Sequence, residues 1–419
     1  MALLTGTPIP PLRRDLELQP VERDGEKLVV MSDALGLDEK AAAAVPMAAA
    51  LVASIFDGKR TAAEVALVLS TEGMDAKESD VQSLADDLDL HGLLDTPSSR
   101  EERRRQLKVF GESPLRPFHA ESRGLPPDAL GMGALLGRFF GAAGGPPLPG
   151  DREAPLGLAA PHIDFARGGQ IYAAAYGELA RRRPPDVVVA LGVAHHSPRS
   201  PWVTTRKAYE TPFGPMMVDA DLHDRIAARL WYDTREEEWV HAKEHSLEFQ
   251  ALWLKYLWRD KTPPWVPILC SSFEPYCEDR PPSVVPTVEK ALSDIGDLLA
   301  EERRKGRRVM ILAGVDLAHV GRRFGDEMDV DDALKKKVET LDRESLDKAL
   351  AGDADGFFLA GVGENAWRKV CGLSALYTAL RWTRAVAGGP LSGMLLGYDQ
   401  KPDPAGGIVS FAGAVFDPA

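Results

Sequence analysis

The chain has 419 residues, of which 44% are hydrophobic, and a formal net charge of -13. At about 100 to 200 residues per domain, this length predicts at least two domains with separate cores. The negative charge argues against general binding to nucleic acid or to an anionic membrane. Because the chain has only 3 cysteines and no basic N-terminal region before an apolar run, we expect a cytoplasmic protein without disulfides or a membrane span.

Residues 1–110 are predicted to form a small α+β domain. Turn residues, a short apolar run and two capping-box patterns indicate a hairpin followed by three helices. The predicted elements in chain order are a turn at Asp24 and Gly25, a strand over 28–31, a helix in the Ala-rich run near Pro46, helices that begin at the capping boxes Thr61 to Glu64 and Ser79 to Gln82, and a stop at Gly92.

This order of elements is typical of a winged-helix domain, and most winged helices bind DNA. The third predicted helix argues against DNA binding here, because it carries acidic side chains where a recognition helix needs basic ones. These side chains are Glu78, Asp80, Asp86, Asp87 and Asp89. The segment resembles PqqD-like domains in its helix start at 57–61 and its ending at 88–94. That resemblance implies recognition of a peptide or partner, and a structural or dimerisation role is the alternative.

Residues 111–154 are predicted to join this domain to the start of the main one. The preceding stretch 100–108 mixes both signs of charge at helical spacing, which is typical of a solvated connecting helix. Residues 141–150 are rich in glycine and proline and lack an apolar period, which indicates a linker. The main domain is therefore expected over 155–419.

The main domain is predicted to be α/β, with a mainly parallel sheet that is covered by helices. Its apolar runs are continuous rather than alternating, as in strands that are buried on both faces. Helical stretches separate these runs. The runs cover residues 156–160, 187–193, 266–270 and 309–315.

Polar side chains with metal-binding chemistry follow three of these predicted strands. They are His162 after the first, His195, His196 and Ser197 after the second, and Asp316 and His319 after the fourth. In an open parallel sheet, ligands bind outside the carboxyl ends of the strands. We therefore expect the histidines to meet at one edge of the sheet and to form a mononuclear metal site.

Cys371 opens an apolar-periodic stretch, 371–382, that is typical of a helix. A thiol at a helix N-terminus is biased toward the thiolate, which is the form that binds metal. Cys270, by contrast, ends an apolar strand and is expected in the core. Cys371 is therefore the third candidate ligand, and Asp316 is the ligand that would replace it.

A competing pattern occurs at His241-Ala-Lys-Glu244-His245. It matches H-x-x-E-H, the inverted zinc-protease motif, in which two histidines share a helix face and hold zinc. Five residues match easily by chance, and the following segment offers only Glu248 as a third ligand before an aromatic run. A zinc peptidase that uses His241, Glu244 and His245 is therefore the weaker alternative.

An ordered series of short motifs resembles the Memo family, which includes the bacterial AmmeMemoRadiSam system protein B. The resemblance extends from about residue 117 to the C-terminus, and the order of the motifs is specific although no single motif is. The motifs are Ala160-Pro161-His162, residues 192–196, Thr211-Pro212 with Asp219, Glu244-His245-Ser246, Val315-Asp316 with His319, Arg323-Phe324, Val370-Cys371-Gly372 and the closing segment 410–416.

The resemblance implies a fold similar to that of LigB-like class III extradiol dioxygenases, together with a redox-active metal. Two sets of residues carry over: the metal ligands His162, His195 and Cys371, and the catalytic pocket residues His245, Asp316 and His319. By similarity to the dioxygenases, His319 would be the acid/base residue. We expect iron(II), with copper as the next candidate and zinc as less favoured.

The chain departs from the family pattern directly after His162. Memo proteins often continue Ala-Gly-Tyr, whereas here a carboxylate, Asp164, follows two residues later. Asp164 either holds the His162 imidazole in one tautomer or caps the helix that we expect to begin near Gly169, and we favour the cap. The N-terminal domain is a further addition to the family pattern.

Together these patterns predict a metal-dependent oxidoreductase of dioxygenase type within an AmmeMemoRadiSam-type modification system. The alternative is a non-catalytic protein that carries a metal or ligand or docks a partner. In either case we expect the N-terminal domain to hold a peptide client or a radical-SAM protein. We expect no nucleic-acid or membrane partner.

Overall fold

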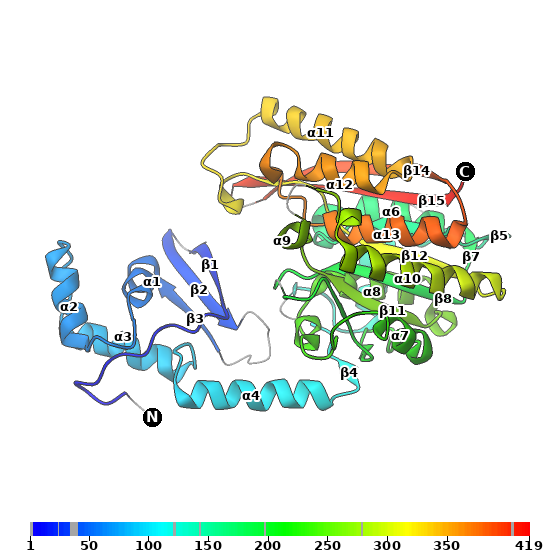
Figure 1. Ribbon diagram of the computed structural model, residues 1–419. Coiled ribbons are helices and arrows are strands. Elements are labelled where there is room, and N and C mark those ends of the chain that lie inside the picture. The colour runs from blue at the N-terminus through cyan, green and yellow to red at the C-terminus, as the bar shows by residue number, and fades with distance from the viewer. Residues whose placement is uncertain are drawn as a thin grey trace. The chain divides into compact units, whose positions relative to one another are not determined.

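The computed structural model describes residues 3–23, 25–33, 41–119, 123–141, 144–196, 198–277, 280–403 and 406–419 (Figure 1). The chain divides into two compact units, Met1–Ser113 (unit 1) and Pro114–Ala419 (unit 2). Asp24 and Ser197, which we placed in a turn and in a strand-end motif, lie outside the described residues. Within the described residues, no helix is both long enough and apolar enough to cross a bilayer.

Unit 1 contains an antiparallel sheet in the order β1-β2-β3. β1 (Leu16–Arg23) and β2 (Glu26–Asp33) form the predicted hairpin, in which Arg23 pairs with Glu26 across the turn. Gly25 has a φ of +82°, a backbone conformation that glycine adopts without a steric penalty. The strand that we predicted over 28–31 is confirmed as part of the longer β2.

The Ala-rich run near Pro46 is only partly helical. Its first half forms β3 (Ala42–Pro46), which pairs with β2, and α1 (Met47–Ser54) begins directly afterwards. The prediction of a single helix was therefore wrong up to Pro46. Proline cannot continue a preceding helix, and β2 offers the residues before it backbone partners that alanine propensity does not reveal.

Two further helices complete the core of unit 1. The capping box of α2 (Ala62–Thr71) is confirmed, since Thr61 accepts from the backbone of Glu64 and Glu64 accepts in return. The second predicted box is wrong, because α3 (Glu78–Leu90) begins one residue before Ser79, whose hydroxyl contacts Asp80 instead. The predicted connecting helix is confirmed as α4 (Pro97–Glu112).

Unit 2 is built on a sheet with the strand order β13-β15-β6-β12-β8-β11-β9, and β14 pairs with β15. The four central strands are parallel and confirm the four predicted apolar runs. They are β6 (Gly157–Ala160), β12 (Val309–Gly314), β8 (Val187–Val193) and β11 (Trp265–Cys270). The antiparallel strands are β9 (Trp202–Thr204), which pairs with β11, and β15 (Gly407–Pro418), which pairs with β6 and on its other side with β13 (His319–Val320) and β14 (Leu391–Asp403).

Helices cover both faces of this sheet, which explains why its strands read as continuous apolar runs (Figure 1). Along β8, Val187 and Val189 pack into one hydrophobic cluster and Val188 into the other. One layer contains α10 (Pro286–Arg304), α12 (Ala354–Val362) and α13 (Leu373–Ala387), and the other contains α5 (Ala129–Arg138), α6 (Phe165–Ala180) and α8 (His245–Trp258). The predicted α/β class is confirmed.

Short elements and one long helix complete unit 2. The long helix, α11 (Asp332–Leu350), packs against α12 and β14. The short elements are β4 (Leu115–Arg116), β5 (Arg152–Glu153), β7 (Arg182–Arg183), β10 (Ala208–Tyr209), α7 (Ala220–Ala227), α9 (Glu274–Cys277) and the 3-10 turns η3 (Glu238–His241), η4 (Arg259–Lys261), η5 (Pro282–Val284), η6 (Arg322–Phe324) and η7 (Glu364–Ala366). The segment 111–154, which we expected to join the domains, includes α5, whose Met132 and Leu136 are fully buried.

Gly192 in β8 gives a test of the contact between the sheet and α8. A Cβ at this position would lie 2.6 Å from Ser246 Oγ and 2.7 Å from Leu247 Cγ, at the start of α8. We expect Gly192→Ala to lower the free energy of unfolding of unit 2 by about 1–3 kcal/mol, the usual cost of overpacking. Denaturant unfolding measures this change.

Gly389→Ala is the matched control, because a Cβ there meets nothing within 4 Å. Its free energy of unfolding should match that of the wild type. Equal stability of the two variants would show that β8 and the start of α8 are not in close contact.

Candidate metal centre

The three strands that carry the predicted ligands end at the same edge of the sheet. β6 and β8 flank β12, and all three run parallel. His162 follows β6, Asp316 follows β12 and His195 follows β8. The predicted convergence of these residues at the carboxyl ends of the strands is therefore confirmed.

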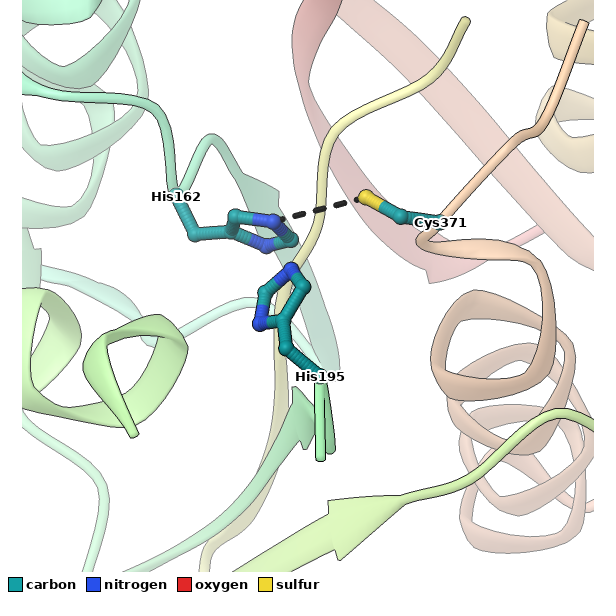
Figure 2. A group of neighbouring side chains, drawn as sticks. All are labelled: His162, His195 and Cys371. Carbon is teal, nitrogen blue, oxygen red and sulfur yellow. Dashed lines mark hydrogen bonds between the residues drawn. The ribbon is translucent and has the colours of Figure 1, made fainter. Parts of the chain in front are cut away.

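His162, His195 and Cys371 form a group that could hold a metal ion. One donor atom from each lies within 4.8 Å of the others, and Cys371 Sγ lies 3.4 Å from His162 Nε2. Figure 2 shows the three side chains pointing toward one another. The two imidazole rings are almost perpendicular, with centroids 5.1 Å apart.

A backbone carbonyl fixes the tautomer of His162. This side chain is only 2% exposed, and its Nδ1–H donates to the carbonyl oxygen of Gly314 at 2.9 Å. Since a carbonyl can only accept, the proton lies on Nδ1, and Nε2 is left to face Cys371. The backbone N–H of His162 also donates to Asp316 Oδ1 at 2.9 Å, so the end of β12 holds both the ring and the backbone of this candidate ligand.

Glu244 performs the same task for His195. It is 2% exposed, both of its carboxylate oxygens lie 3.0 Å from His195 Nδ1, and one accepts from the backbone N–H of His195. The other accepts from the N–H of Ser246, which makes Glu244 the N-cap of α8. The carboxylate therefore directs Nε2 of His195 toward the site. We had predicted no such role for Glu244, although an acidic residue directly before an apolar helix was the available signal.

Cys371 is positioned by a strained and well anchored segment. Asn365, Ala366 and Lys369 have positive φ angles of 62°, 52° and 48°, which are unfavourable for residues with a Cβ. Arg368, buried between them, donates to Asp342 and to the carbonyl of Ala360, both at 2.6 Å. These bonds hold the loop in a conformation that the free chain would rarely adopt.

Gly372 allows this loop to lie directly against the end of β12. A Cβ there would lie 2.6 Å from the carbonyl oxygen of Asp316 and from Val315 Cβ. The N–H of Gly372 donates to that same carbonyl at 3.1 Å. The predicted helix after Cys371 is confirmed as α13, which begins two residues later at Leu373.

The electrostatics of the group favour a thiolate beside protonated imidazoles when no metal is bound. Burial alone would raise the pKa of Cys371, but His162, His319 and the hydrogen bonds to His162 and His195 lower it to about 5. Burial likewise acts to lower the pKa of both histidines. Asp316 and Cys371 nevertheless raise the pKa of His162, and Glu244 and Cys371 raise that of His195 well above its ordinary value. A cation can replace these imidazole protons without a change in the anions around them.

The three predicted catalytic residues surround this group. The ring of His245 stacks on His195 at 4.9 Å, and His245 with His195 and Glu244 forms a second group that could hold a metal ion. Asp316 Oδ2 lies 3.7 Å from His162 Nε2. His319 packs its ring against Phe324, and its Nδ1 lies 3.1 Å from the carbonyl of Leu317. Among the described residues, Asp316 belongs to neither candidate metal group, so Cys371 remains the third candidate donor.

Asp164 is the cap that we favoured. Its side chain accepts from the N–H of Arg167 at the start of α6, which begins at Phe165 rather than near Gly169. Arg167 also donates to the other carboxylate oxygen at 2.5 Å. Because the carbonyl of Gly314 already fixes the imidazole of His162, the alternative role for Asp164 was wrong.

The geometry that a zinc peptidase requires at His241 is not formed. His241 ends the 3-10 turn η3, whereas His245 opens α8, so the two do not share one helix face. The Nε2–H of His241 donates to the carbonyl of Val203 at 2.9 Å, and its Nδ1 accepts from the hydroxyl of Tyr209 at 2.7 Å. Burial lowers the pKa of His241 to about 3, which keeps the ring neutral. The peptidase interpretation of this motif was therefore wrong.

A cavity of about 290 Å³ adjoins the metal group. Two of the candidate ligands, His195 and Cys371, form part of its wall. The remaining lining residues are Val193, Ala194, Cys270, Ser272, Glu274, Gly361, Ala366, Lys369, Val370, Leu373 and Ser374. A larger groove of about 580 Å³, between α10, α12 and α13, contains none of the candidate ligands.

The fold and the donors define a helix-covered, mainly parallel α/β protein with a candidate mononuclear metal site at the carboxyl ends of its strands. The chain belongs to the Memo family, since the family described as Memo-like protein matches residues 136–415. Unit 1 lies outside the matched residues.

Several curated relatives carry the same family name. A MEMO1 family protein of Aquifex aeolicus is 26% identical over 262 residues, which cover 62% of this chain and 63% of that protein. One of Desulfurococcus amylolyticus is 24% identical over 283 residues (65% and 87%), and one of Thermus thermophilus is 27% identical over 220 residues (52% and 60%). The match thus spans less than two thirds of the Aquifex and Thermus proteins.

Among solved structures, the chain is similar to the uncharacterized protein JW3007 from Escherichia coli K12. The two are 14% identical, with a TM-score of 0.36, and the alignment covers 62% of this chain and 98% of that one.

The lowered pKa of Cys371 gives a direct test of the site. In the metal-free protein we expect the thiolate at neutral pH, and its ultraviolet absorbance should disappear only as the pH falls through about 5. Cys371→Ser should abolish this transition. Cys270→Ser should leave it unchanged, because burial raises the pKa of Cys270 above its ordinary value. A transition near the ordinary value of 9 would show that the imidazoles do not stabilise the thiolate.

Proposed function

We propose that this protein is a metal-dependent oxidoreductase of dioxygenase type that binds one iron(II) ion at His162, His195 and Cys371. Copper is the next candidate metal, and zinc is less favoured. The observation that carries the proposal is the position of the donors, two of which line a cavity large enough for a small organic molecule. Three protein donors leave coordination positions open, as in non-haem iron sites, whereas structural zinc sites are closed by four protein ligands.

The donor set fits a redox-active metal. Each histidine has its Nδ1 held by an acceptor, so each offers Nε2, and the thiolate supplies the negative charge. A thiolate in the anionic position makes the site softer than two histidines and a carboxylate, which favours iron or copper over magnesium or calcium. Glu244 and the carbonyl of Gly314 are the kind of supporting partners that metal-binding histidines require.

The surrounding residues have proposed roles that follow from their contacts. When bound, the metal would supply the binding and reduction of dioxygen beside the substrate. His319 is the proposed acid/base residue, since its Nδ1 is held near the carbonyl of Leu317 and its Nε2 can exchange a proton. His245, whose pKa burial lowers well below its ordinary value, is neutral and suited to hydrogen bonding within the site. Asp316 orients His162 by accepting a hydrogen bond from the backbone N–H of His162.

The second candidate is a non-catalytic protein that carries a metal or ligand within a modification system. The presence of a separate unit 1, which lies outside the residues that match the family, supports this alternative. Oxygen consumption distinguishes the two. The iron-loaded enzyme should consume dioxygen with a catechol-like or peptide substrate, and Cys371→Ser should not, whereas a carrier would bind iron and consume none with any substrate.

We further propose that unit 1 is a PqqD-like winged-helix domain that docks a peptide client or a radical-SAM protein. Its sheet ends in two edge strands, β1 and β3, either of which could pair with an added strand. The acidic residues of α3 support a protein or peptide partner over nucleic acid. In the AmmeMemoRadiSam-type system that we propose, this unit would bring the client or the partner to the metal-binding protein.

Metal content after anaerobic purification tests the proposed site. We expect about one iron or copper ion per wild-type chain, and we expect His162→Ala, His195→Ala and Cys371→Ser each to lose most of it, since each removes one of three donors. Elemental analysis of the folded proteins gives the result.

His196→Ala is the matched control, because it removes the neighbouring histidine, which belongs to neither metal group. It should retain wild-type metal content. Equal stoichiometric metal in all of these variants would place the metal somewhere else on the chain.

A further inference from the structure

We propose that Arg116, His119 and Arg123 are positioning residues of the metal centre, which act through the backbone of residues 241–244. We call these three side chains the carbonyl clamp. The inference rests on the proposed metal site, and it concerns a segment that lies more than a hundred residues away from Glu244 in sequence. None of the motifs in the sequence pointed to this role.

The carbonyl clamp donates to four consecutive carbonyl oxygens. Arg116 donates from Nε to His241 at 3.1 Å and from Nη2 to Glu244 at 2.8 Å. His119 Nε2–H donates to Ala242 at 2.7 Å, and Arg123 Nη2 donates to Lys243. Each carbonyl from 241 to 244 therefore has a side-chain donor from one short stretch of chain.

These carbonyls need donors from outside because the backbone here changes direction. The 3-10 turn η3 ends at His241 and α8 begins at His245, so the residues between them lie outside both helices. A buried carbonyl without a hydrogen-bond partner destabilises the folded state. The carbonyl clamp supplies the missing bonds, and it thereby fixes the path of the segment that carries Glu244.

The carbonyl clamp is itself held by the helix that Glu244 caps. Glu248, in the first turn of α8, is fully buried and forms an ion pair with Arg116. It also accepts from Arg123 Nε at 2.6 Å and from the backbone N–H of His119 at 3.2 Å. The guanidinium of Arg116, also fully buried, lies over the ring of Tyr209 at 4.9 Å. The carbonyl clamp, the 241–244 segment and the start of α8 are therefore joined by a continuous set of hydrogen bonds and ion pairs.

The connection to the metal centre passes through Glu244. Its backbone carbonyl is held by Arg116, while its side chain holds both the ring and the backbone N–H of His195. A shift of the 241–244 backbone therefore moves the His195 imidazole. Metal–ligand distances in proteins lie within about 0.2 Å of their usual values, so a small shift of the His195 ring weakens binding. The carbonyl clamp would thus set ligand geometry as well as stability.

Arg182 is a buried arginine of the same unit that serves as a comparison for Arg116. It is 3% exposed and forms ion pairs with Glu178 and Asp417 at 2.9 Å. Neither carboxylate belongs to the group of His162, His195 and Cys371. Arg116 and Arg182 are therefore both buried and both paired with carboxylates, but they differ in their connection to the site.

Titration of the full-length, metal-free protein with cobalt(II) tests the inference. Cobalt reports both its affinity and, through its visible absorption bands, its coordination geometry. Arg116→Lys keeps the positive charge beside Glu248 but replaces the planar fork that reaches both His241 and Glu244. We expect its Kd for cobalt to rise about 10- to 100-fold, with altered bands, as is usual when a partner behind a metal ligand is lost.

Arg182→Lys is the control. This variant should be less stable than the wild type but should keep the wild-type Kd for cobalt and the wild-type absorption bands. Thermal unfolding and circular dichroism establish that each variant is folded. A folded Arg116→Lys protein with wild-type affinity and bands would overturn the inference. So would an equal loss of affinity in Arg182→Lys, because the effect would then be one of general stability.

If Arg116→Lys does not fold, His119→Phe tests the carbonyl clamp instead. It removes the His119 donor to the carbonyl of Ala242 and leaves both arginines in place. A raised Kd with altered bands supports the carbonyl clamp, and unchanged binding overturns it. If the wild-type protein binds no cobalt at all, the proposed metal site has failed, an outcome that is distinct from failure of the carbonyl clamp alone.

Discussion

The carboxylate of Glu244 lies in the interior, where its two oxygens accept from the ring of His195, from the backbone N–H of His195 and from the N–H of Ser246. A buried carboxylate is unfavourable unless such donors surround it. Since those donors come from the end of β8 and the start of α8, the charge ties a strand to a helix at the edge of the sheet. This arrangement fixes the positions of His195 and of the nearby His245. His195 consequently lies within reach of His162 and Cys371.

The same arrangement explains why the group is suited to a cation. Negative charge is built into the site at Glu244, Asp316 and the Cys371 thiolate, and the imidazoles between them are held as protonated rings when no metal is present. Binding a metal replaces protons, so the anions need no rearrangement. Arg368 and Asp342 hold the strained loop before Cys371 in place. This loop brings the Cys371 thiolate to the group from the side opposite His162 (Figure 2).

The sequence allowed the parallel strands and the positions of His162 and His195 to be predicted, because both follow from local patterns. Cys371 was predicted from its position at a helix start together with the resemblance to the Memo family. Continuous apolar runs marked the strands, and polar residues at their ends marked the edge where His162 and His195 meet. The partners of these histidines, Glu244 and the carbonyl of Gly314, depend on which strands become neighbours, and no local pattern encodes that. The prediction of a helix in the Ala-rich run was wrong for a related reason, because pairing with β2 outweighed helix propensity before Pro46.

X-ray absorption spectroscopy of the anaerobically prepared, iron-loaded protein tests the central claim most directly, because it identifies the atoms bound to the metal. Our account predicts one sulfur ligand and two imidazole nitrogens. Cys371→Ser and His195→Ala bind iron more weakly and are therefore measured with excess iron, where the first should lack the sulfur ligand and the second should lack one imidazole. A spectrum with only nitrogen and oxygen ligands, unchanged in both variants, would contradict it.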